Sequence, residues 1–196
     1  MPAPVTSGRS ARDTRQRILR AARLRFAAQS YEATALRHIA GDVGVDVALV
    51  HRAFGSKEAL FREAVASAFD DGFAQAAAAP APAGPLAARL SRQLGQAQAD
   101  EPAPFDIIVR SLCSGQARPM LREMVLRDFV APLAARFDED GQTRATLALA
   151  CLAGVALLGE GLGLPALDPA RMEEVVPMLE AMLNACLGVP TDATPA

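Results

Sequence analysis

Apolar residues recur every three or four positions along most of the chain, which is the period of amphipathic helices. The first such segment follows Asp13 and Thr14, two residue types that can cap a helix. It places Ile18, Ala22 and Phe26 on one stripe and arginines on the other side. No segment alternates apolar and polar residues at every second position, as strands do. The pattern therefore predicts an all-α protein.

Two short apolar segments follow, and a glycine separates them. Thr34 can cap the first segment, and Gly44 can supply the left-handed residue that ends it. Asp46 can cap the second, which runs to about Ala53. Two short helices joined by a glycine turn are typical of a helix-turn-helix.

A fourth segment starts after another capping residue, Ser56, and carries two adjacent apolar rows that continue to Phe73. We expect one long helix that ends in the Ala- and Pro-rich stretch 76–85, which predicts a linker. Five further apolar segments follow. The sequence thus divides into a disordered tail at 1–10, a helix-turn-helix domain at 11–56, a helical domain at 57–188 and a disordered tail at 189–196.

Prolines mark two positions where the helices of the second domain should deviate from a straight path. Pro132 must kink or end the helix that starts near Pro119, because proline has no amide hydrogen to donate. Asp168 followed by Pro169 predicts the start of the last helix, which contains Pro177 and should bend there.

Charge is distributed unevenly between the two parts of the chain. Residues 1–60 hold ten of the 20 Lys and Arg but only five of the 22 Asp and Glu, while the whole chain has a net charge of −2. A basic first third on an acidic remainder favours a nucleic-acid-binding head, although a solvated arginine-rich face gives the same count. The only lysine, Lys57, lies just after the predicted cap of the fourth helix.

Other classes of protein find little support in the sequence. Cys113, Cys151 and Cys186 are too widely spaced for a zinc motif and are interpreted as reduced core thiols. The longest uncharged run, 145–159, is shorter than the roughly 20 residues that span a bilayer. With no phosphate-binding loop and no nucleophile beside a base, we expect no catalytic site, no metal and no cofactor. The prediction is a cytoplasmic protein that does not enter a membrane.

Residues 15–61 combine apolar, turn and capping residues at fixed spacing. They are Ile18-Leu19-x-Ala21-Ala22-x-Leu24-x-Phe26, Tyr31-x-Ala33-Thr34-x-Leu36-x-x-Ile39-Ala40, Val43-Gly44-Val45-Asp46 and Phe54-Gly-Ser56-Lys57-Glu58-x-Leu60-Phe61. This segment resembles the DNA-binding head of the TetR-type transcriptional regulators, and the layout of 86–187 resembles the helical ligand-binding and dimerisation body of the same family. Ser30 replaces a usual glycine, and Arg52 and Ala53 replace a usual His-Tyr pair.

The resemblance implies that the helix from Val47 to Ala53 lies in the major groove of double-stranded DNA. Val47, Ala48 and Leu49 would meet base edges, and Arg52 would reach a guanine edge or a phosphate. His51 and residues at the starts of the neighbouring helices would bind phosphates. Val50 is expected to pack inward. His38 is expected to be exposed. The predicted DNA contacts are Thr34, Arg37, Val47, Ala48, Leu49, His51, Arg52 and Lys57.

The resemblance also implies a homodimer and a small-molecule effector. The last two helices, about 144–162 and 168–187, would pair with their symmetry mates in a four-helix interface, and an unidentified small apolar molecule would bind within the body. The predicted interface residues are Leu147, Ala150, Gly154, Leu158, Val175, Leu179, Met182 and Leu183. The candidate effector-binding residues are Phe105, Ile108, Met120, Met124 and Phe129.

The expected function is therefore a ligand-responsive repressor that leaves a pseudo-palindromic operator when its effector binds. The alternative is a helical dimerisation or adaptor protein whose head does not bind operator DNA. A redox sensor that uses one of the cysteines is a third hypothesis.

Overall fold

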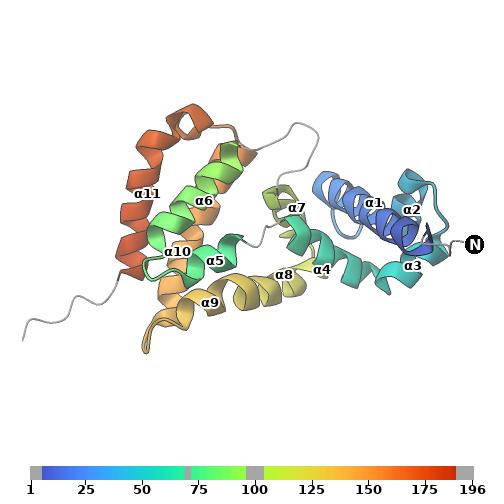
Figure 1. Ribbon diagram of the computed structural model, residues 1–196, viewed down its shortest axis with the longest axis horizontal. Helices are drawn as coiled ribbons and strands as arrows, with labels where there is room; N and C mark the ends of the chain where they lie inside the picture. Colours follow the sequence, from blue (N-terminus) through green and yellow to red (C-terminus); the bar gives the residue numbers. More distant parts are fainter. Residues whose placement is uncertain (1–5, 69–71, 96–103, 189–196) are drawn as a thin grey trace, which may run out of the picture. The chain divides into compact units, whose positions relative to one another are not determined.

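The computed structural model describes residues 6–68, 72–95 and 104–188, and every regular element in these ranges is a helix (Figure 1). The expected all-α class is confirmed. The tail expected at 189–196 lies outside the described residues.

The chain forms two compact units, and the first contains the residues of the predicted helix-turn-helix. It also includes a fourth helix, a helix from the middle of the chain and the start of the next one, up to Leu121. Its helices are α1 (Thr6–Ala28), α2 (Leu36–Val43), α3 (Val47–Phe54), α4 (Lys57–Ala68), α7 (Pro104–Ser111) and the start of α8 (Ala117–Met124). We call this unit the head.

The first helix begins earlier than the sequence predicted. α1 starts at Thr6, so residues 6–10 are helical and do not form the expected tail. Thr14 lies inside the helix, where its hydroxyl donates a hydrogen bond of 2.9 Å to the Ser10 carbonyl oxygen. A threonine can satisfy its hydroxyl in this way within a helix, which is why a capping residue type alone did not locate the start.

Three aromatic rings form the centre of the head. Phe26 of α1 and Phe61 of α4 are 5.0 Å apart between ring centroids and meet edge to face. Tyr31 meets Phe61 in the same way at 5.0 Å and stacks on Phe26 at 6.1 Å. All three side chains are at most 5% exposed, and such edge-to-face pairs add to the free energy gained by burial. This cluster fixes the turn after α1 against the start of α4.

The expected long fourth helix is described as two helices. α4 ends at Ala68, α5 begins at Gly72, and the intervening residues lie outside the described ranges. The expected linker at 76–85 is wrong over most of its length, because α5 extends to Ala78 and α6 begins at Ala83. Alanine is the strongest helix former, and a proline is tolerated in the first turn of a helix, so this composition does not prevent helix formation.

The second unit contains the remaining helices and has its own core. α6 packs against α11 through a row of buried leucines that begins at Leu86 and Leu90 and that the sequence predicted. The elements are α5 (Gly72–Ala78), α6 (Ala83–Gly95), the end of α8, η1 (Val125–Val130), α9 (Ala131–Ala134), α10 (Gly141–Ala156), η2 (Leu157–Gly161), η3 (Pro165–Leu167), η4 (Pro169–Arg171) and α11 (Met172–Leu187). We call this unit the body.

A π-helical segment accommodates Pro132 within a continuous run of helical residues. α8, η1 and α9 follow one another without a break, and η1 is a π-helix in which the amide of Ala131 donates to the carbonyl of Leu126, five residues back. Pro132 lies in the first turn after this segment. The wider turn relieves the clash that a proline ring has with the carbonyl four residues earlier in an α-helix, so the helix continues to Ala134.

The helix formed by α10 and η2 is longer than the uncharged run suggested. At 21 residues, Gly141–Gly161 is long and apolar enough to span a membrane by length and composition. Only 22% of its most apolar window is buried within the chain. Much of its apolar surface therefore faces outward.

The last helix begins with the predicted capping residue. Asp168 accepts a hydrogen bond of 2.8 Å from the Ala170 amide and caps the short 3-10 turn η4, after which α11 continues to Leu187. Pro177 lies inside α11, as predicted.

Candidate nucleic-acid interface

The turn between α2 and α3 has the geometry that the sequence predicted. Gly44 has a φ of 72°, a left-handed conformation that favours glycine, and the amide of Val45 donates to the carbonyl of Ala40. Asp46 then caps α3 by accepting a hydrogen bond of 2.7 Å from the Ala48 amide. These contacts set α3 at a fixed angle to α2, as a helix-turn-helix requires.

α3 has one buried face and one exposed face. Val50 is completely buried and Phe54 is 8% exposed, so these two side chains attach the helix to the head. Val47 is 37% exposed, and Leu49 is half-buried. The other predicted DNA contacts of α3, which are Ala48, His51 and Arg52, are exposed.

Thr34 does not fulfil its predicted role. Its side chain is completely buried, and its hydroxyl donates to the Ser30 carbonyl oxygen at 3.2 Å. Ala35, not Thr34, is the N-cap of α2, and no side chain bonds to that helix end. The predicted cap is therefore wrong, and a buried side chain has no access to a phosphate. Arg37, one turn further on, is exposed.

The two histidines lie in different environments. His51 bonds through Nδ1 to the Gly55 carbonyl oxygen at 3.1 Å. Because a carbonyl only accepts, Nδ1 carries the proton, and Nε2 of the neutral ring is an acceptor. His38, which we expected to be exposed, is half-buried, and its Nδ1 atom is buried without a hydrogen-bond partner.

Lys57 lies on an aromatic ring. Its Nζ atom is 4.2 Å from the centroid of Tyr31. Partial burial lowers the pKa of Lys57, and the nearby Glu32 carboxylate opposes that effect. The side chain is half-buried, so it is not an ordinary solvated surface charge.

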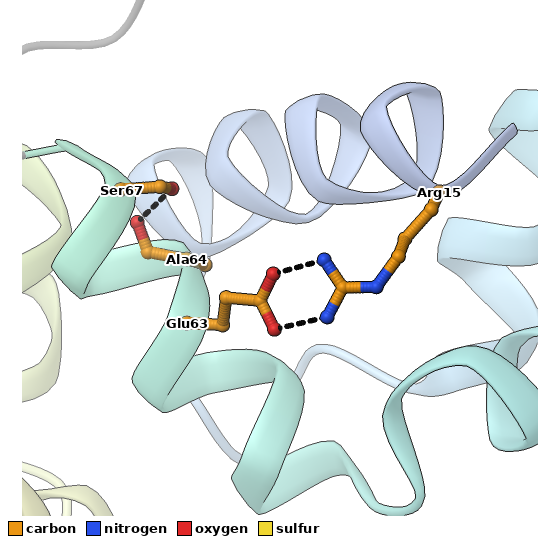
Figure 2. Close-up of polar contacts among 4 residues, drawn as sticks. All are labelled: Arg15, Glu63, Ala64 and Ser67. Atoms are coloured by element: carbon orange, nitrogen blue, oxygen red, sulfur yellow. Dashed lines mark hydrogen bonds and ion pairs between the residues drawn. The ribbon is translucent and has the colours of Figure 1, made fainter. Parts of the chain in front are cut away.

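Several arginines of α1 hold the head together, a role that the sequence did not reveal. Figure 2 shows the guanidinium of Arg15 paired with both carboxylate oxygens of Glu63 on α4, with one N–O distance of 2.7 Å. Arg17 donates to the Val43 carbonyl oxygen at 2.7 Å. Part of the positive charge of the first sixty residues is thus used inside the head.

A second arginine pair connects α1 to α2. Arg25 makes two hydrogen bonds of 2.6 Å to the carboxylate of Asp42. The hydrogen bonds from Arg25 lower the pKa of Asp42, because they stabilise its charged form.

In the body, the predicted dimer residues divide into exposed and buried groups. Leu147 is 54% exposed and Leu158 is 39% exposed, both on the helix formed by α10 and η2. Met182 of α11 is 52% exposed. Leu179 and Leu183 are 3% and 0% exposed, so they belong to the core of this chain and their assignment to an interface is wrong. The remaining members are Ala150, which is exposed, and Gly154 and Val175, which are half-buried.

The predicted interface on α11 combines side chains from two faces of the helix. Leu179 and Leu183 lie on the buried face, whereas Met182 lies on the exposed face. The structure instead exposes Met178, which is 70% exposed and was not predicted, together with Met182. These methionines lie four residues apart and share one face of the helix.

The candidate effector-binding residues do not all fall in one unit. Phe105, Ile108 and Met120 belong to the head unit, and Met124 and Phe129 to the body. In the body, the Phe129 ring is 4.8 Å from that of Phe73. Within the described residues, no group of three His, Cys, Asp or Glu side chains is placed to bind a metal.

Two of the cysteines are closer together than their spacing in the sequence suggested. Cys186 of α11 lies beside Cys151 of α10, and burial followed by the neighbouring thiol raises the pKa of Cys186. Cys113, in the turn after α7, is exposed. A raised pKa reduces the fraction of Cys186 that is present as thiolate, and the thiolate is the form that reacts with an oxidant in a redox sensor.

A helix-turn-helix with an exposed polar face on its second helix, followed by a helical body, defines a DNA-binding transcriptional regulator. The family described as "Bacterial regulatory proteins, tetR family" matches residues 18–64. The description "Tetracyclin repressor-like, C-terminal domain" matches residues 85–187, more than half of the chain. The chain belongs to the TetR family of bacterial transcriptional regulators.

Solved structures of similar proteins agree with this assignment. The multidrug binding protein EbrR, in a complex with imidazole, is 26% identical with a TM-score of 0.63 and covers 97% of this chain and 100% of its own. A TetR-family regulator from Streptomyces coelicolor A3 is 25% identical with a TM-score of 0.60, over 95% of this chain and 100% of its own. GusR of Salmonella enterica shares the fold at 22% identity and a TM-score of 0.62, over 90% and 96%. No curated protein sequence matches the chain.

Proposed function

We propose that this regulator is a homodimeric repressor that leaves a pseudo-palindromic operator when a small apolar molecule binds its body. The observation that carries the proposal is the two-faced α3, in which Val50 and Phe54 anchor the helix while Ala48, His51 and Arg52 remain exposed. A helix of this length fits the major groove of B-DNA, where base edges identify the sequence.

The exposed side chains of α3 divide into two kinds of contact. Val47 and Ala48 offer apolar surface to thymine methyl groups, and Arg52 offers donors to a guanine edge or a phosphate. His51 donates from Nδ1 to Gly55, so it can donate to a phosphate only when Nε2 is also protonated. Neutral His51 would instead accept a hydrogen bond through Nε2.

Arg37 and Lys57 would hold the head on the DNA backbone. Arg37 is exposed in the first turn of α2, and Lys57 is the first residue of α4. Free amides and the positive end of the helix dipole favour a phosphate at such positions. The ammonium group of Lys57, which lies over the Tyr31 ring, would then bind the phosphate.

A second copy of the chain would cover the apolar surface of the body. Leu147, Met178 and Met182 are each more than half exposed, on the two helices that the family resemblance assigns to dimerisation. Exposed apolar side chains on adjacent helices mark an association surface. A two-fold pair of heads would then contact half-sites about one turn of DNA apart, roughly 34–36 Å.

An effector would act by binding one state of the body more tightly than another. EbrR, whose structures contain imidazole or proflavin, indicates that small aromatic molecules suit a body of this kind. The Phe73–Phe129 pair, 4.8 Å apart, offers aromatic surface within the body of this chain. We propose that the protein acts in the cytoplasm, where its DNA target is.

The proposal is tested by selecting bound fragments from genomic DNA and titrating the selected fragment at several salt concentrations. A repressor should show saturable binding that weakens steeply with salt, because each neutralised phosphate releases a counterion. Arg37→Ala should weaken binding and make the salt slope shallower, whereas Arg171→Ala, a surface arginine paired with Glu174 in the body, should not. Binding that does not saturate, or does not respond to salt, would support the adaptor alternative.

A further inference from the structure

The turn between α7 and α8 is attached to the head by the side chain of one glutamate. Ser114 opens α8: its Oγ accepts a hydrogen bond of 2.8 Å from the Ala117 amide, and its carbonyl accepts one from Arg118. The same Oγ donates to Oε1 of Glu32, at 2.5 Å. Glu32 lies 82 residues away in the sequence, in the segment between α1 and α2.

The Glu32 carboxylate receives a second hydrogen bond from the same turn. The backbone amide of Gln116 also donates to it, and the hydrogen bonds from Ser114 and Gln116 lower the pKa of Glu32. The first amides of a helix have no partner within the helix, and its N-terminal end favours negative charge. The carboxylate therefore supplies what the start of α8 lacks.

The chemistry of Ser114 makes this contact specific. A hydroxyl has one proton to donate, which goes to Glu32, while one of its two lone pairs accepts from the Ala117 amide. Ser114 is only 5% exposed, so water has little access to replace Glu32 as the acceptor. Glu32 itself is exposed, but the hydroxyl that it contacts is nearly buried. Water therefore competes less with this hydrogen bond than with an ion pair on the surface.

The segment that carries Glu32 is also connected to the DNA-reading helices. The neighbouring Tyr31 stacks on Phe26, meets Phe61 edge to face and lies beneath the ammonium of Lys57. Thr34, three residues further on, is buried just before α2. Glu32 is thus adjacent in the chain to residues whose packing positions α2 and the start of α4. A displacement of Glu32 would therefore affect the position of both helices.

We propose that Glu32 is a positioning residue that ties the start of α8 to the head, so that DNA binding by the head and the order of the α8 N-terminus change together. The helical residues that begin at α8 continue through η1 to Ala134, which belongs to the body. This inference depends on the proposed DNA binding. By reciprocity, a change that loosens the start of α8 must disfavour the DNA-bound head.

Hydrogen exchange of the full-length protein, with and without a selected DNA fragment, tests the proposal. DNA binding to the wild-type protein should slow exchange of the Gln116 and Ala117 amides about tenfold, because ordering of the head is transmitted through Glu32. Glu32→Gln keeps the size of the side chain but loses its charge. This variant should still bind DNA, and should lose most of the slowing at these two amides.

A second variant separates the tie from helix capping. Ser114→Asp can still cap α8, since aspartate is a good N-cap acceptor, but it has no proton for Glu32 and repels its charge. It should behave like Glu32→Gln. Glu58→Gln, on the exposed part of α4 with a partner 3.6 Å away at Arg62, is the matched control and should retain the slowing.

The outcomes distinguish the tie from the proposed function. If the wild type binds DNA but its Gln116 and Ala117 amides exchange at an unchanged rate, the tie is refuted and DNA binding stands. The same conclusion follows if both variants retain the full slowing. If the wild type binds no DNA, both proposals fail together.

Discussion

The functional faces of the head and the body expose different kinds of side chain. In the head, charged residues of α1 are tied to neighbouring helices through Arg15–Glu63 and Arg25–Asp42, and the side chains left exposed on α3 are mostly polar or small. In the body, large apolar side chains remain exposed on the last two long helices, with Leu147 and Met178 at 54% and 70%.

This difference indicates what each unit needs from a partner. The exposed face of α3 in the head presents donors to a polyanion, so that face would recognise its partner by charge and hydrogen bonds. The body has a core of its own but presents apolar surface that water does not favour. The head is thus suited to nucleic acid, and the proposed partner of the body is a second copy of the chain.

The largest expected effect comes from a charge on the exposed face of the body. Met182→Glu should convert the proposed dimer to a monomer, because two carboxylates would be buried in its apolar interface. DNA affinity should then fall by about 100-fold or more, since only one head binds at a time. Sedimentation equilibrium measures the mass and fluorescence anisotropy the affinity.

The control places the same charge on an exposed apolar residue of the head. Leu24 on α1 is 43% exposed, so Leu24→Glu should leave the mass unchanged. A Met182→Glu protein that remains dimeric would show that another surface pairs the chains.

Arg52→Ala should have the next largest effect. Loss of a contact to a base edge costs about 1–3 kcal/mol and relaxes specificity at one position of the site. Measured on a panel of single-base variants of the selected fragment, the loss should be confined to one or two base pairs. A loss that is equal on every sequence would reassign Arg52 to the phosphates.

Lys57→Ala should weaken binding to all sequences alike and make the salt slope shallower by about one. It should also lower the free energy of unfolding by about 0.5–1 kcal/mol, because the ammonium group lies over the Tyr31 ring. Urea titration measures the second effect independently of DNA. If stability falls and binding does not, Lys57 acts on Tyr31 alone.

The smallest effect is expected inside the head. Arg25→Gln should lower the melting temperature at pH 7 by roughly 1–3 °C, as exposed ion pairs contribute little. The folded state depresses the pKa of Asp42 below its ordinary 3.8, so this contribution is present above that pH and is lost as pH falls through the lower folded value. Melting curves of the two proteins should therefore converge as pH falls well below 3.8. A difference that persists there would indicate a packing role for Arg25.

Local features were predictable from the sequence, and contacts between distant segments were not. Gly44, Asp46 and Ser56 were identified correctly because a turn or a cap depends on a few adjacent residues. Thr34 was misassigned because its hydroxyl has two possible backbone partners, and only the packing of the head selects Ser30.

The burial of apolar residues in the body was predicted less well. Leu183 and Met182 are adjacent and both apolar, yet one is completely buried and the other is 52% exposed. Periodicity gives the width of an apolar stripe but does not say which edge meets the same chain and which meets another. The contact between Glu32 and Ser114 spans 82 residues, and neither residue type signals it.

The π-helical segment before Pro132 has a consequence for how the sequence can change over evolution. A π turn holds one more residue than an α turn, so side chains beyond it are rotated by about 100° relative to an uninterrupted α-helix. Deleting one residue between Val125 and Val130 would restore the α-helical register without shortening the helix by a full turn. Single-residue gaps among relatives are therefore expected at this position, and each gap would leave the side chains beyond it on the same faces of the helix.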